Sequence, residues 1–261
     1  MRTTLPLAVP VSGPLYEGHF PGRPILPGVG LLDLSIRALA AEGAAPELRE
    51  ITSLRLRKLV GPGDALEIAV KAYDADGAIR FEVRRAGECV AVAGLILGSP
   101  EAGAPIAGVP CGSGHVRVHG APPLDRLLPH RPPMRFITGV DSEMEEGLVC
   151  LAQIPARCAF AENGSAPGLV AVEMAAQTAA VFEALRRGRE QENAGPRIGY
   201  LVGARDVKLS RGRLQAERPL RAVIRQTAMA PPLSTYAFAV EDGELVVASG
   251  TLSTWLTATA A

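Results

Sequence analysis

The strongest constraint on the fold is an internal repeat that pairs a glycine with an acidic residue inside an apolar segment. In the first half of the chain Gly28 precedes a segment that contains Asp33, and in the second half Gly168 precedes a segment that contains Glu173. Gly168 follows Gly28 by 140 residues, and Glu173 follows Asp33 by the same 140 residues. A repeat of this kind indicates structural units of one design, so we expect the two halves to fold alike.

Each half combines one mainly apolar segment of helical length with several alternating apolar and polar segments typical of strands. Short turn signals such as Asp76-Gly77 connect the strands, and consecutive strands with short connections form antiparallel sheets. A helix that is apolar on nearly all sides has to be covered by such a sheet. We therefore predict an α+β fold, a double hot-dog in which two antiparallel sheets each wrap a central helix and join edge to edge. The predicted helices are 29–41, 124–128 and 169–182, and the predicted strands are 50–60, 65–73, 79–84, 89–97, 134–140, 148–154, 198–209, 220–229, 234–240 and 245–256.

The length of 261 residues suits two domains of roughly 130 residues each. A stretch rich in Gly, Pro and Ala separates the halves, so we predict an N-terminal domain at 1–98, a linker at 99–121 and a C-terminal domain at 122–261. His115 and His119 fall in this linker, and we expect neither to take part in catalysis.

The composition argues against several classes of function. Lys and Arg together number 27, as do Asp and Glu, so no net charge attracts the chain to nucleic acid or to an anionic membrane. No stretch reaches the ~18 uninterrupted apolar residues of a membrane span, and the first residues lack the apolar run of a signal peptide. These features predict a cytoplasmic protein. The four cysteines show no Cys-x-x-Cys spacing, which argues against zinc, and we expect no metal and no other cofactor.

The two acids in the apolar segments have different neighbours one helical turn later. Gln177 follows Glu173 by four residues and Arg37 follows Asp33 by four, so each pair shares a helix face. Beside Arg37, the pKa of Asp33 is expected to be lowered, which keeps this side chain a carboxylate. Burial beside a neutral amide is expected to raise the pKa of Glu173 toward the range of a general acid. We therefore predict Glu173 as the catalytic acid, with Gln177 holding it in place.

His19 is the candidate general base, because imidazole titrates near neutral pH. It lies in a loop with two Pro-Gly turns, shortly before the first apolar segment. At the 140-residue offset the second half has Ala159 instead. Gly28 and Gly168 each stand at the start of a predicted helix, where a backbone N–H without a helical partner can stabilise a developing oxyanion.

The motif from His19 to Gly28 reads His-Phe-Pro-Gly-Arg-Pro-Ile-Leu-Pro-Gly and is followed by an acid fourteen residues after the histidine. It resembles the β-hydroxyacyl-(acyl carrier protein) dehydratases of bacterial fatty-acid synthesis. The segment from Pro167 to Gln177 fits the helix part of the same pattern, and 127–134, Leu-Leu-Pro-His-Arg-Pro-Pro-Met, looks like the opening segment of those enzymes. More narrowly, the halves look like the two small dehydratase-type proteins of aryl polyene pigment biosynthesis, fused into one chain.

In that family the active site lies between two hot-dog units, with the histidine from one unit and the acid from the other. The resemblance therefore implies an intrachain pseudo-dimer with one complete site, His19 with Glu173 and Gln177, and one degenerate site that pairs Asp33 with Ala159. It implies dehydration of a 3-hydroxyacyl thioester, bound to an acyl carrier protein, to a trans-2-enoyl thioester in fatty-acid or polyene-type biosynthesis. His19 would take a proton from C2, and Glu173 would assist departure of the 3-hydroxyl.

Two other functions stay open. The same fold hosts thioesterases, and the absence of a histidine at the second-half position equivalent to His19 also fits an acyl-thioester binding module without catalytic activity. His130 is the alternative base in the second half, although we expect it to hold a loop or helix end. The acidic carrier protein should meet basic residues near the site, and the candidates are Arg55, Arg57 and Lys58, or Arg186, Arg187 and Arg189.

Overall fold

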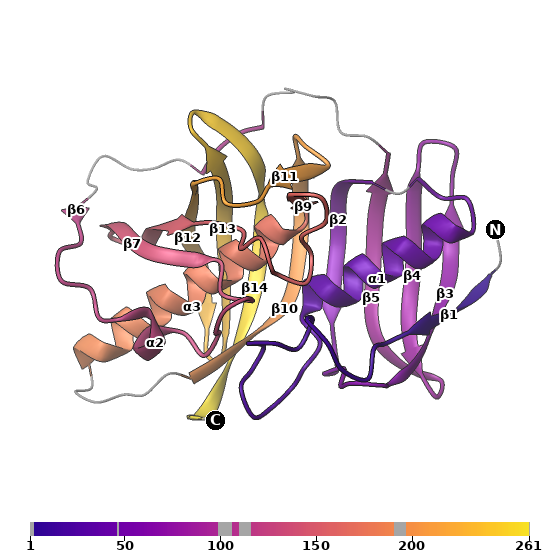
Figure 1. Cartoon of the computed structure of the whole chain (residues 1–261), viewed down its shortest axis with the longest axis horizontal. Coiled ribbons are helices and arrows are strands. Elements are labelled where there is room, and N and C mark those ends of the chain that lie inside the picture. The colour runs from indigo at the N-terminus through magenta and orange to yellow at the C-terminus, as the bar shows by residue number, and fades with distance from the viewer. Residues whose placement is uncertain (1–2, 46, 99–105, 110–115, 191–196, 261) are drawn as a thin grey trace.

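The computed structural model describes residues 3–45, 47–98, 106–109, 116–190 and 197–260. Its main element is a twelve-stranded sheet in the order β1-β3-β4-β5-β2-β10-β14-β13-β12-β8-β7-β6 (Figure 1). The strands of the first half are β1 (Thr4–Ala8), β2 (Leu48–Leu56), β3 (Ala65–Tyr73), β4 (Ala78–Arg85) and β5 (Glu88–Leu97). Those of the second half are β6 (Val116–Arg117), β7 (Ile137–Met144), β8 (Gly147–Ala152), β10 (Arg197–Leu209), β12 (Leu220–Ala230), β13 (Leu233–Asp242) and β14 (Leu245–Ala260).

The two halves join through β2 and β10. These strands pair in antiparallel register, from Glu50 opposite Lys208 to Arg55 opposite Gly203. The pairing makes one continuous sheet out of two and covers two edges that would otherwise expose unpaired backbone groups. The predicted double hot-dog with edge-to-edge joining is therefore confirmed, and the chain is a pseudo-dimer of its own halves.

Two long helices lie on the same face of this sheet, α1 (Gly28–Ala41) across the first half and α3 (Val170–Glu190) across the second (Figure 1). They contact each other near the middle of the molecule, where the first turn of each helix lies. A short helix, α2 (Leu124–Leu127), precedes the second unit. Helix α3 extends beyond the predicted end at residue 182, because the apolar pattern stops there while the more polar residues that follow still favour a helix.

Four short strands were not predicted. β1 pairs with β3, and β9 (Ser165–Pro167) pairs with β11 (Arg213–Gln215) in a separate two-stranded sheet. β6 lies inside the predicted linker and pairs with β7. Such short strands depend on their tertiary partners more than on local pattern. Of the linker, residues 99–105 and 110–115, including His115, lie outside the described residues, and His119 is exposed.

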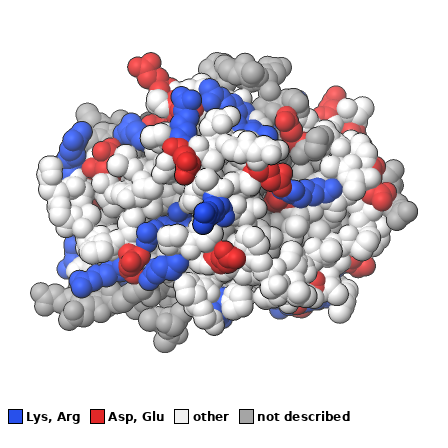
Figure 2. Space-filling view, in the orientation of Figure 1, with Lys and Arg blue, Asp and Glu red and all other residues white. Residues whose placement is uncertain are grey.

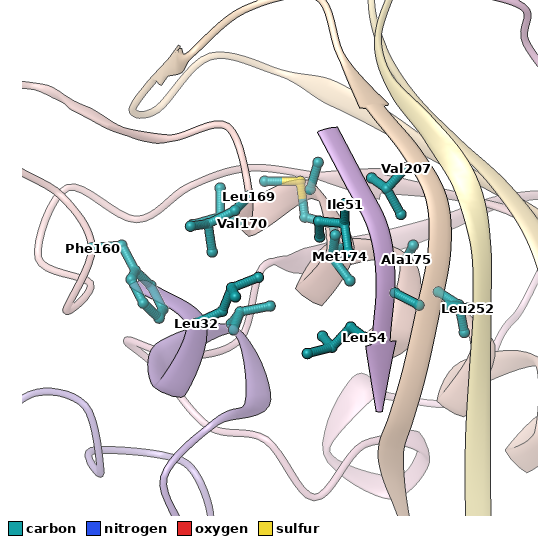
Figure 3. Packing of buried hydrophobic residues seen from close by; sticks show 14 of the residues in the cluster. Leu32, Ile51, Leu54, Phe160, Leu169, Val170, Met174, Ala175, Val207 and Leu252 are labelled. Carbon is teal, nitrogen blue, oxygen red and sulfur yellow. The ribbon is translucent and has the colours of Figure 1, made fainter. Parts of the chain in front are cut away.

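The main hydrophobic core is a continuous cluster with side chains from both halves. Figure 3 shows Leu32 of α1 and Ile51 of β2 together with Met174 of α3 and Val207 of β10. Because the helices are packed into this shared core, the loops that precede them are held in place at the junction of the halves. None of the described helices is long and apolar enough to span a membrane.

Candidate active site

His19 lies in the loop before α1, and hydrogen bonds within that loop hold its backbone. Its N–H donates to the carbonyl of Tyr16 (3.1 Å), and its carbonyl accepts from the N–H of Ile25 (3.1 Å). The Tyr16 hydroxyl donates to the carbonyl of Pro10 (2.7 Å). Phe20 stacks on the imidazole with ring centroids 4.2 Å apart. The Pro- and Gly-rich sequence thus forms a compact loop that presents the imidazole in one orientation.

The hydrogen bonding of His19 decides which ring nitrogen can act as a base. Nδ1 lies 2.9 Å from the carbonyl oxygen of Ile25. Because a carbonyl only accepts hydrogen bonds, Nδ1 carries the proton and Nε2 keeps its lone pair. Burial and then the neighbouring His130 lower the pKa of His19 to about 4. The ring is therefore neutral at pH 7, and Nε2 can accept a proton.

Glu173 lies near the start of α3, where its side chain is buried beside Gln177. The amide nitrogen Nε2 of Gln177 donates to Glu173 Oε1 (3.1 Å) and to the carbonyl of Met134 (2.8 Å). The amide oxygen of Gln177 accepts from the N–H of Phe136 (2.9 Å). The predicted contact between the two side chains is present, and Gln177 also ties α3 to the segment that leads into β7.

His130 was expected to hold a loop or helix end, and its ring lies in the same pocket as His19 and Glu173. Its Nε2 is 3.3 Å from Glu173 Oε1, and its ring centroid is 5.2 Å from that of His19. Its buried Nδ1 has no hydrogen-bond partner among the described residues, so the contact of Nε2 with Glu173 is the side-chain contact that connects this loop to α3. The sequence contains the Leu-Pro-His-Arg segment, but nothing in its spacing predicted a contact between His130 and Glu173, which lies 43 residues later.

The loops that carry the two histidines are locked together at Gly18. The N–H of Arg131 donates to the carbonyl of Gly18 (3.0 Å). Gly18 has a φ of +80°, and a Cβ atom there would lie 2.0 Å from the carbonyl oxygen of Arg131. Glycine suits both the left-handed backbone and this close approach. Two loops from different halves are therefore held in one relative position.

Glu173 is ionised, which corrects the expectation of a raised pKa. Burial alone would raise the pKa of this carboxyl. Its hydrogen bond and electrostatic interaction with His130, followed by the interactions with His19 and Gln177, together lower the pKa by more than burial raises it. The result is a pKa of about 2. The expectation failed because it considered only the helix neighbours of Glu173, whereas His130 arrives from a separate loop.

These side chains line one pocket at the junction of the halves. The pocket reaches Gly28, the first residue of α1, whose backbone N–H has no partner within the helix. A polar corner beside apolar walls suits a ligand with a polar head and an apolar chain. The apolar side chains of the lining are Phe20, Ile25, Leu26, Leu31, Leu56, Leu59, Val60, Ala176 and Leu201.

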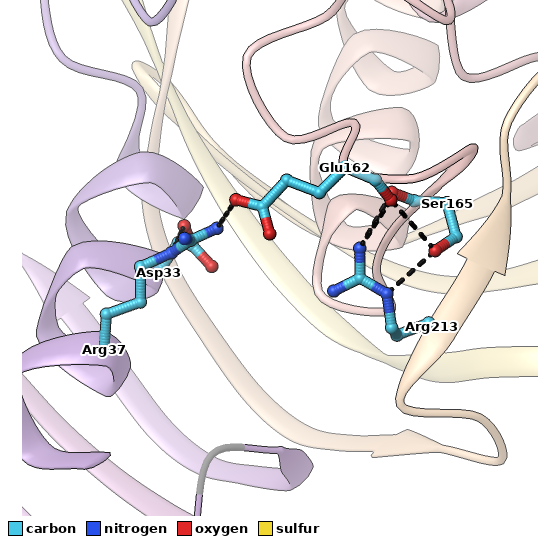
Figure 4. A network of polar contacts seen from close by, with 5 residues as sticks. All are labelled: Asp33, Arg37, Glu162, Ser165 and Arg213. Atoms are coloured by element: carbon cyan, nitrogen blue, oxygen red, sulfur yellow. Dashed lines mark hydrogen bonds and ion pairs between the residues drawn. The ribbon is translucent and has the colours of Figure 1, made fainter. Parts of the chain in front are cut away.

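A second cavity is lined by Asp33 and Gly168, the counterparts of Glu173 and Gly28. Figure 4 shows its polar network. Arg37 binds Asp33 (2.8 Å) and also Glu162 of the second half (2.8 Å). The predicted ion pair is thus present and extended by a second carboxylate, so charged groups that bind each other occupy this cavity.

Three features distinguish the second cavity from the first. Ala159, at the position equivalent to the histidine, offers no ionisable group. The N–H of Gly168 donates to the carbonyl of Gly212 (2.7 Å) and is not available to an oxyanion, which corrects the predicted supporting role of Gly168. Burial outweighs the effect of Arg37 and raises the pKa of Asp33, where the sequence had predicted a lowered one.

The cluster of His19, His130 and Glu173 could also hold a metal ion, which the spacing along the chain did not indicate. One donor atom of each lies within 4.8 Å of the others. The carboxylate oxygen in this group already accepts hydrogen bonds from Gln177 and His130, so hydrogen bonding alone accounts for the arrangement. The expectation of a metal-free site stays a prediction.

Comparison with known proteins shows that a family of dehydratases matches each half of the chain. The ApeP-like family, described as ApeP dehydratase, matches residues 122–260, and the ApeI-like family, described as ApeI dehydratase, matches residues 1–94. The 3-hydroxyacyl-[acyl-carrier-protein] dehydratase FabZ of Anaeromyxobacter sp. (strain Fw109-5) is 34% identical over 84 residues, which cover 28% of this chain and 53% of the relative. FabZ of Roseiflexus sp. (strain RS-1) is 41% identical over 75 residues, with coverages of 24% and 50%. The chain thus spans about half the length of these curated relatives.

Solved dehydratase structures share the fold. The dehydratase domain of the polyketide PpsC from Mycobacterium tuberculosis has a TM-score of 0.66 at 16% identity, covering 98% of this chain and 93% of that one. The bifunctional dehydratase-cyclase domain in ambruticin biosynthesis has a TM-score of 0.58 at 20% identity, with coverages of 97% and 90%. These likenesses concern the fold alone, whereas the family matches extend over both halves of the sequence. The chain belongs to the ApeP-like dehydratase family and joins an ApeI-like half to an ApeP-like half.

Proposed function

We propose that this chain dehydrates 3-hydroxyacyl thioesters to trans-2-enoyl thioesters in the synthesis of fatty-acid or polyene-type chains. The observation that carries the proposal is the junction pocket, which brings together a neutral imidazole, a carboxylate and a helix-start N–H. This elimination needs a base for the C2 proton, a donor for the thioester oxygen and a group that orients the 3-hydroxyl. His19, Gly28 and Glu173 meet these three needs.

Removal of the C2 proton falls to Nε2 of His19, because Nδ1 is engaged with Ile25. The electron pair left at C2 moves onto the thioester oxygen, where the N–H of Gly28 would stabilise the negative charge. His19 becomes an imidazolium in this step. The carboxylate of Glu173, within 4.8 Å, stabilises that positive charge.

Glu173 cannot protonate the leaving hydroxyl itself, because its pKa of about 2 leaves it ionised at neutral pH. We assign it the role of accepting a hydrogen bond from the 3-hydroxyl, which positions the C3–O bond. The imidazolium of His19 then returns its proton to the hydroxyl as this bond breaks. The electron pair forms the double bond between C2 and C3, water leaves, and both side chains regain their initial states.

An acyl carrier protein is the proposed source of the substrate. Of the two basic clusters indicated by the sequence, we favour Arg55, Arg57 and Lys58, since Lys58 lines the catalytic pocket and all three side chains are exposed. Figure 2 shows acidic and basic side chains interspersed on the face in view. With no net charge on the chain, recognition of an acidic partner depends on a local group of this kind.

Turnover of 3-hydroxybutyryl-acyl carrier protein by the full chain tests the proposal, with the product followed by mass spectrometry. His19→Ala and Glu173→Gln should each lower kcat/KM by about 100-fold or more. Asp33→Asn, the matched amide substitution in the second cavity, should retain activity as long as thermal unfolding shows a folded protein.

Three results would contradict the proposal. Equal loss of activity in a folded Asp33→Asn variant would remove the single-site assignment. Release of a free 3-hydroxy acid would favour a thioesterase. Binding of the substrate without any turnover, unchanged by His19→Ala, would favour a silent binding module.

A further inference from the structure

Arg131 follows His130 directly in the loop between α2 and β7, and its side chain binds the backbone of that loop. Nη1 of the guanidinium donates to the carbonyls of Leu128 (2.7 Å) and His130 (2.9 Å), and Nη2 donates to the carbonyl of Asp125 (3.3 Å). A guanidinium carries five N–H donors in a rigid plane, and its charge strengthens the bonds that it makes. One side chain therefore connects the peptide of His130 to two carbonyls at α2.

Helix α2 is a fixed reference for this loop, because it contacts α3, the helix that carries Glu173. Leu127 at the end of α2 and Leu128 after it are both buried. The last carbonyls of a helix have no partner within the helix, and Arg131 supplies donors to those of Asp125 and Leu128. The guanidinium thus fastens the loop to an element that packing holds against the acid-bearing helix.

The ring of His130 depends on its backbone more than the ring of His19 does. His19 is oriented by the bond between its Nδ1 and the carbonyl of Ile25, whereas Nδ1 of His130 has no hydrogen-bond partner among the described residues. Nε2 of His130 lies 3.3 Å from Glu173 Oε1, which is at the long end for a hydrogen bond. A loop displacement of about 0.5 Å would therefore break this contact.

We propose that Arg131 is a positioning residue for the dehydration, because its guanidinium fixes the loop that holds His130 against Glu173. Arg131 is not among the described residues that line the catalytic pocket, so it acts on the reaction through His130. The inference rests on the proposed function, since the position of His130 affects turnover only if this pocket performs the chemistry.

The first test is turnover of 3-hydroxybutyryl-pantetheine by Arg131→Met, which keeps an unbranched side chain and removes the guanidinium. Without a carrier protein in the assay, the lost charge cannot act through docking. We expect kcat to fall by about tenfold, the cost of losing a long hydrogen bond to a charged group, and KM to stay nearly constant. The control is Arg135→Met, because Arg135 binds the side chain of Asp125 and not the loop carbonyls. It should keep the wild-type kcat.

A double-mutant cycle separates positioning from a general loss of structure. On a His130→Ala background, Arg131→Met should lower kcat by less than about twofold, because two residues that act through one contact are not additive. A full further loss of about tenfold in the folded double variant would overturn the inference. In Arg131→Lys, a single ammonium group cannot bond the carbonyls in the same planar arrangement, so kcat should lie between those of the wild type and Arg131→Met. If thermal unfolding shows that Arg131→Met does not fold, the cycle is measured with Arg131→Lys, and a wild-type kcat in that variant would overturn the inference.

The second test does not require turnover. Glu173 is ionised and only accepts hydrogen bonds, so Nε2 of His130 carries the proton between them. His130→Ala identifies the NMR signal of that proton by its loss. The signal should broaden or disappear in Arg131→Met and stay in Arg135→Met, even if the chain does not dehydrate the thioester. An unchanged signal in folded Arg131→Met would contradict the positioning role, whereas failure of the wild type to turn over the thioester would count against the proposed function.

Discussion

Replacing His130 with alanine should reduce activity and move the acidic limb of the pH profile upward. His130 lowers the pKa of both His19 and Glu173, so both pKa values rise when its ring is removed. For His19 the rise is from about 4 toward the ordinary 6.5, and it is partial because burial, the larger cause, remains. A higher pKa means that more of His19 is protonated near pH 5, where it can no longer act as a base.

The size of the effect follows from the geometry. The distance of 3.3 Å between His130 Nε2 and Glu173 Oε1 is at the long end for a hydrogen bond. We therefore take the lower end of the range for bonds to charged groups, about 1.5 kcal/mol. If this interaction positions Glu173 in the transition state, its loss lowers kcat/KM by about tenfold near pH 8. Near pH 5 the loss should be larger, because the protonation of His19 adds to it.

The assay is kcat/KM for 3-hydroxybutyryl-acyl carrier protein as a function of pH. The control variant is His130→Asn, whose amide N–H can still donate to Glu173 and should recover part of the activity near pH 8. Thermal unfolding shows whether each variant is folded. A folded His130→Ala variant with the wild-type pH profile would refute the reasoning, because it would mean that His130 is not coupled to His19 or Glu173.

Three further predictions follow from the structure. Gly18→Ala should destabilise the fold by more than the roughly 1–3 kcal/mol of backbone strain, because the added Cβ would also lie 2.0 Å from the carbonyl oxygen of Arg131. The control in thermal unfolding is Gly22→Ala, since Gly22 has a similar φ of +75° and a Cβ there would meet nothing within 4 Å. Lys58→Glu should raise KM for a carrier-protein substrate but not for the same acyl group on pantetheine, and equal effects on both would exclude a docking role. Dialysis against EDTA should leave kcat unchanged, because hydrogen bonds already hold the carboxylate of Glu173; activity that is lost and then restored by zinc would show the opposite.

Local sequence patterns were sufficient to predict the main helices and strands. The predicted strand 65–73 coincides with β3, and the predicted helix 29–41 differs from α1 by one residue. Periodicity works here because each element buries a face set by its own residues. It failed for β9 and β11, which are three residues each and exist because they pair with each other.

The candidate site was predictable only in part. His19 was predicted from its Pro-Gly loop ahead of an apolar segment, and Glu173 and Gln177 from their spacing of four residues within an apolar segment. Gly168 was assigned a free N–H that the structure shows bonded to the carbonyl of Gly212.

By itself the sequence determined the two hot-dog units, the family resemblance and the presence of Ala159 at the second-half position equivalent to His19, since these depend only on which residues occur at which spacing. The tertiary structure alone decided the protonation of the site, which runs opposite to the expectation for Glu173. The physical reason is that a pKa depends on charges and hydrogen bonds a few ångströms away. His130, which lowers the pKa of both His19 and Glu173, comes from a loop held by the hydrogen bond between Arg131 and Gly18, and no local pattern encodes that contact.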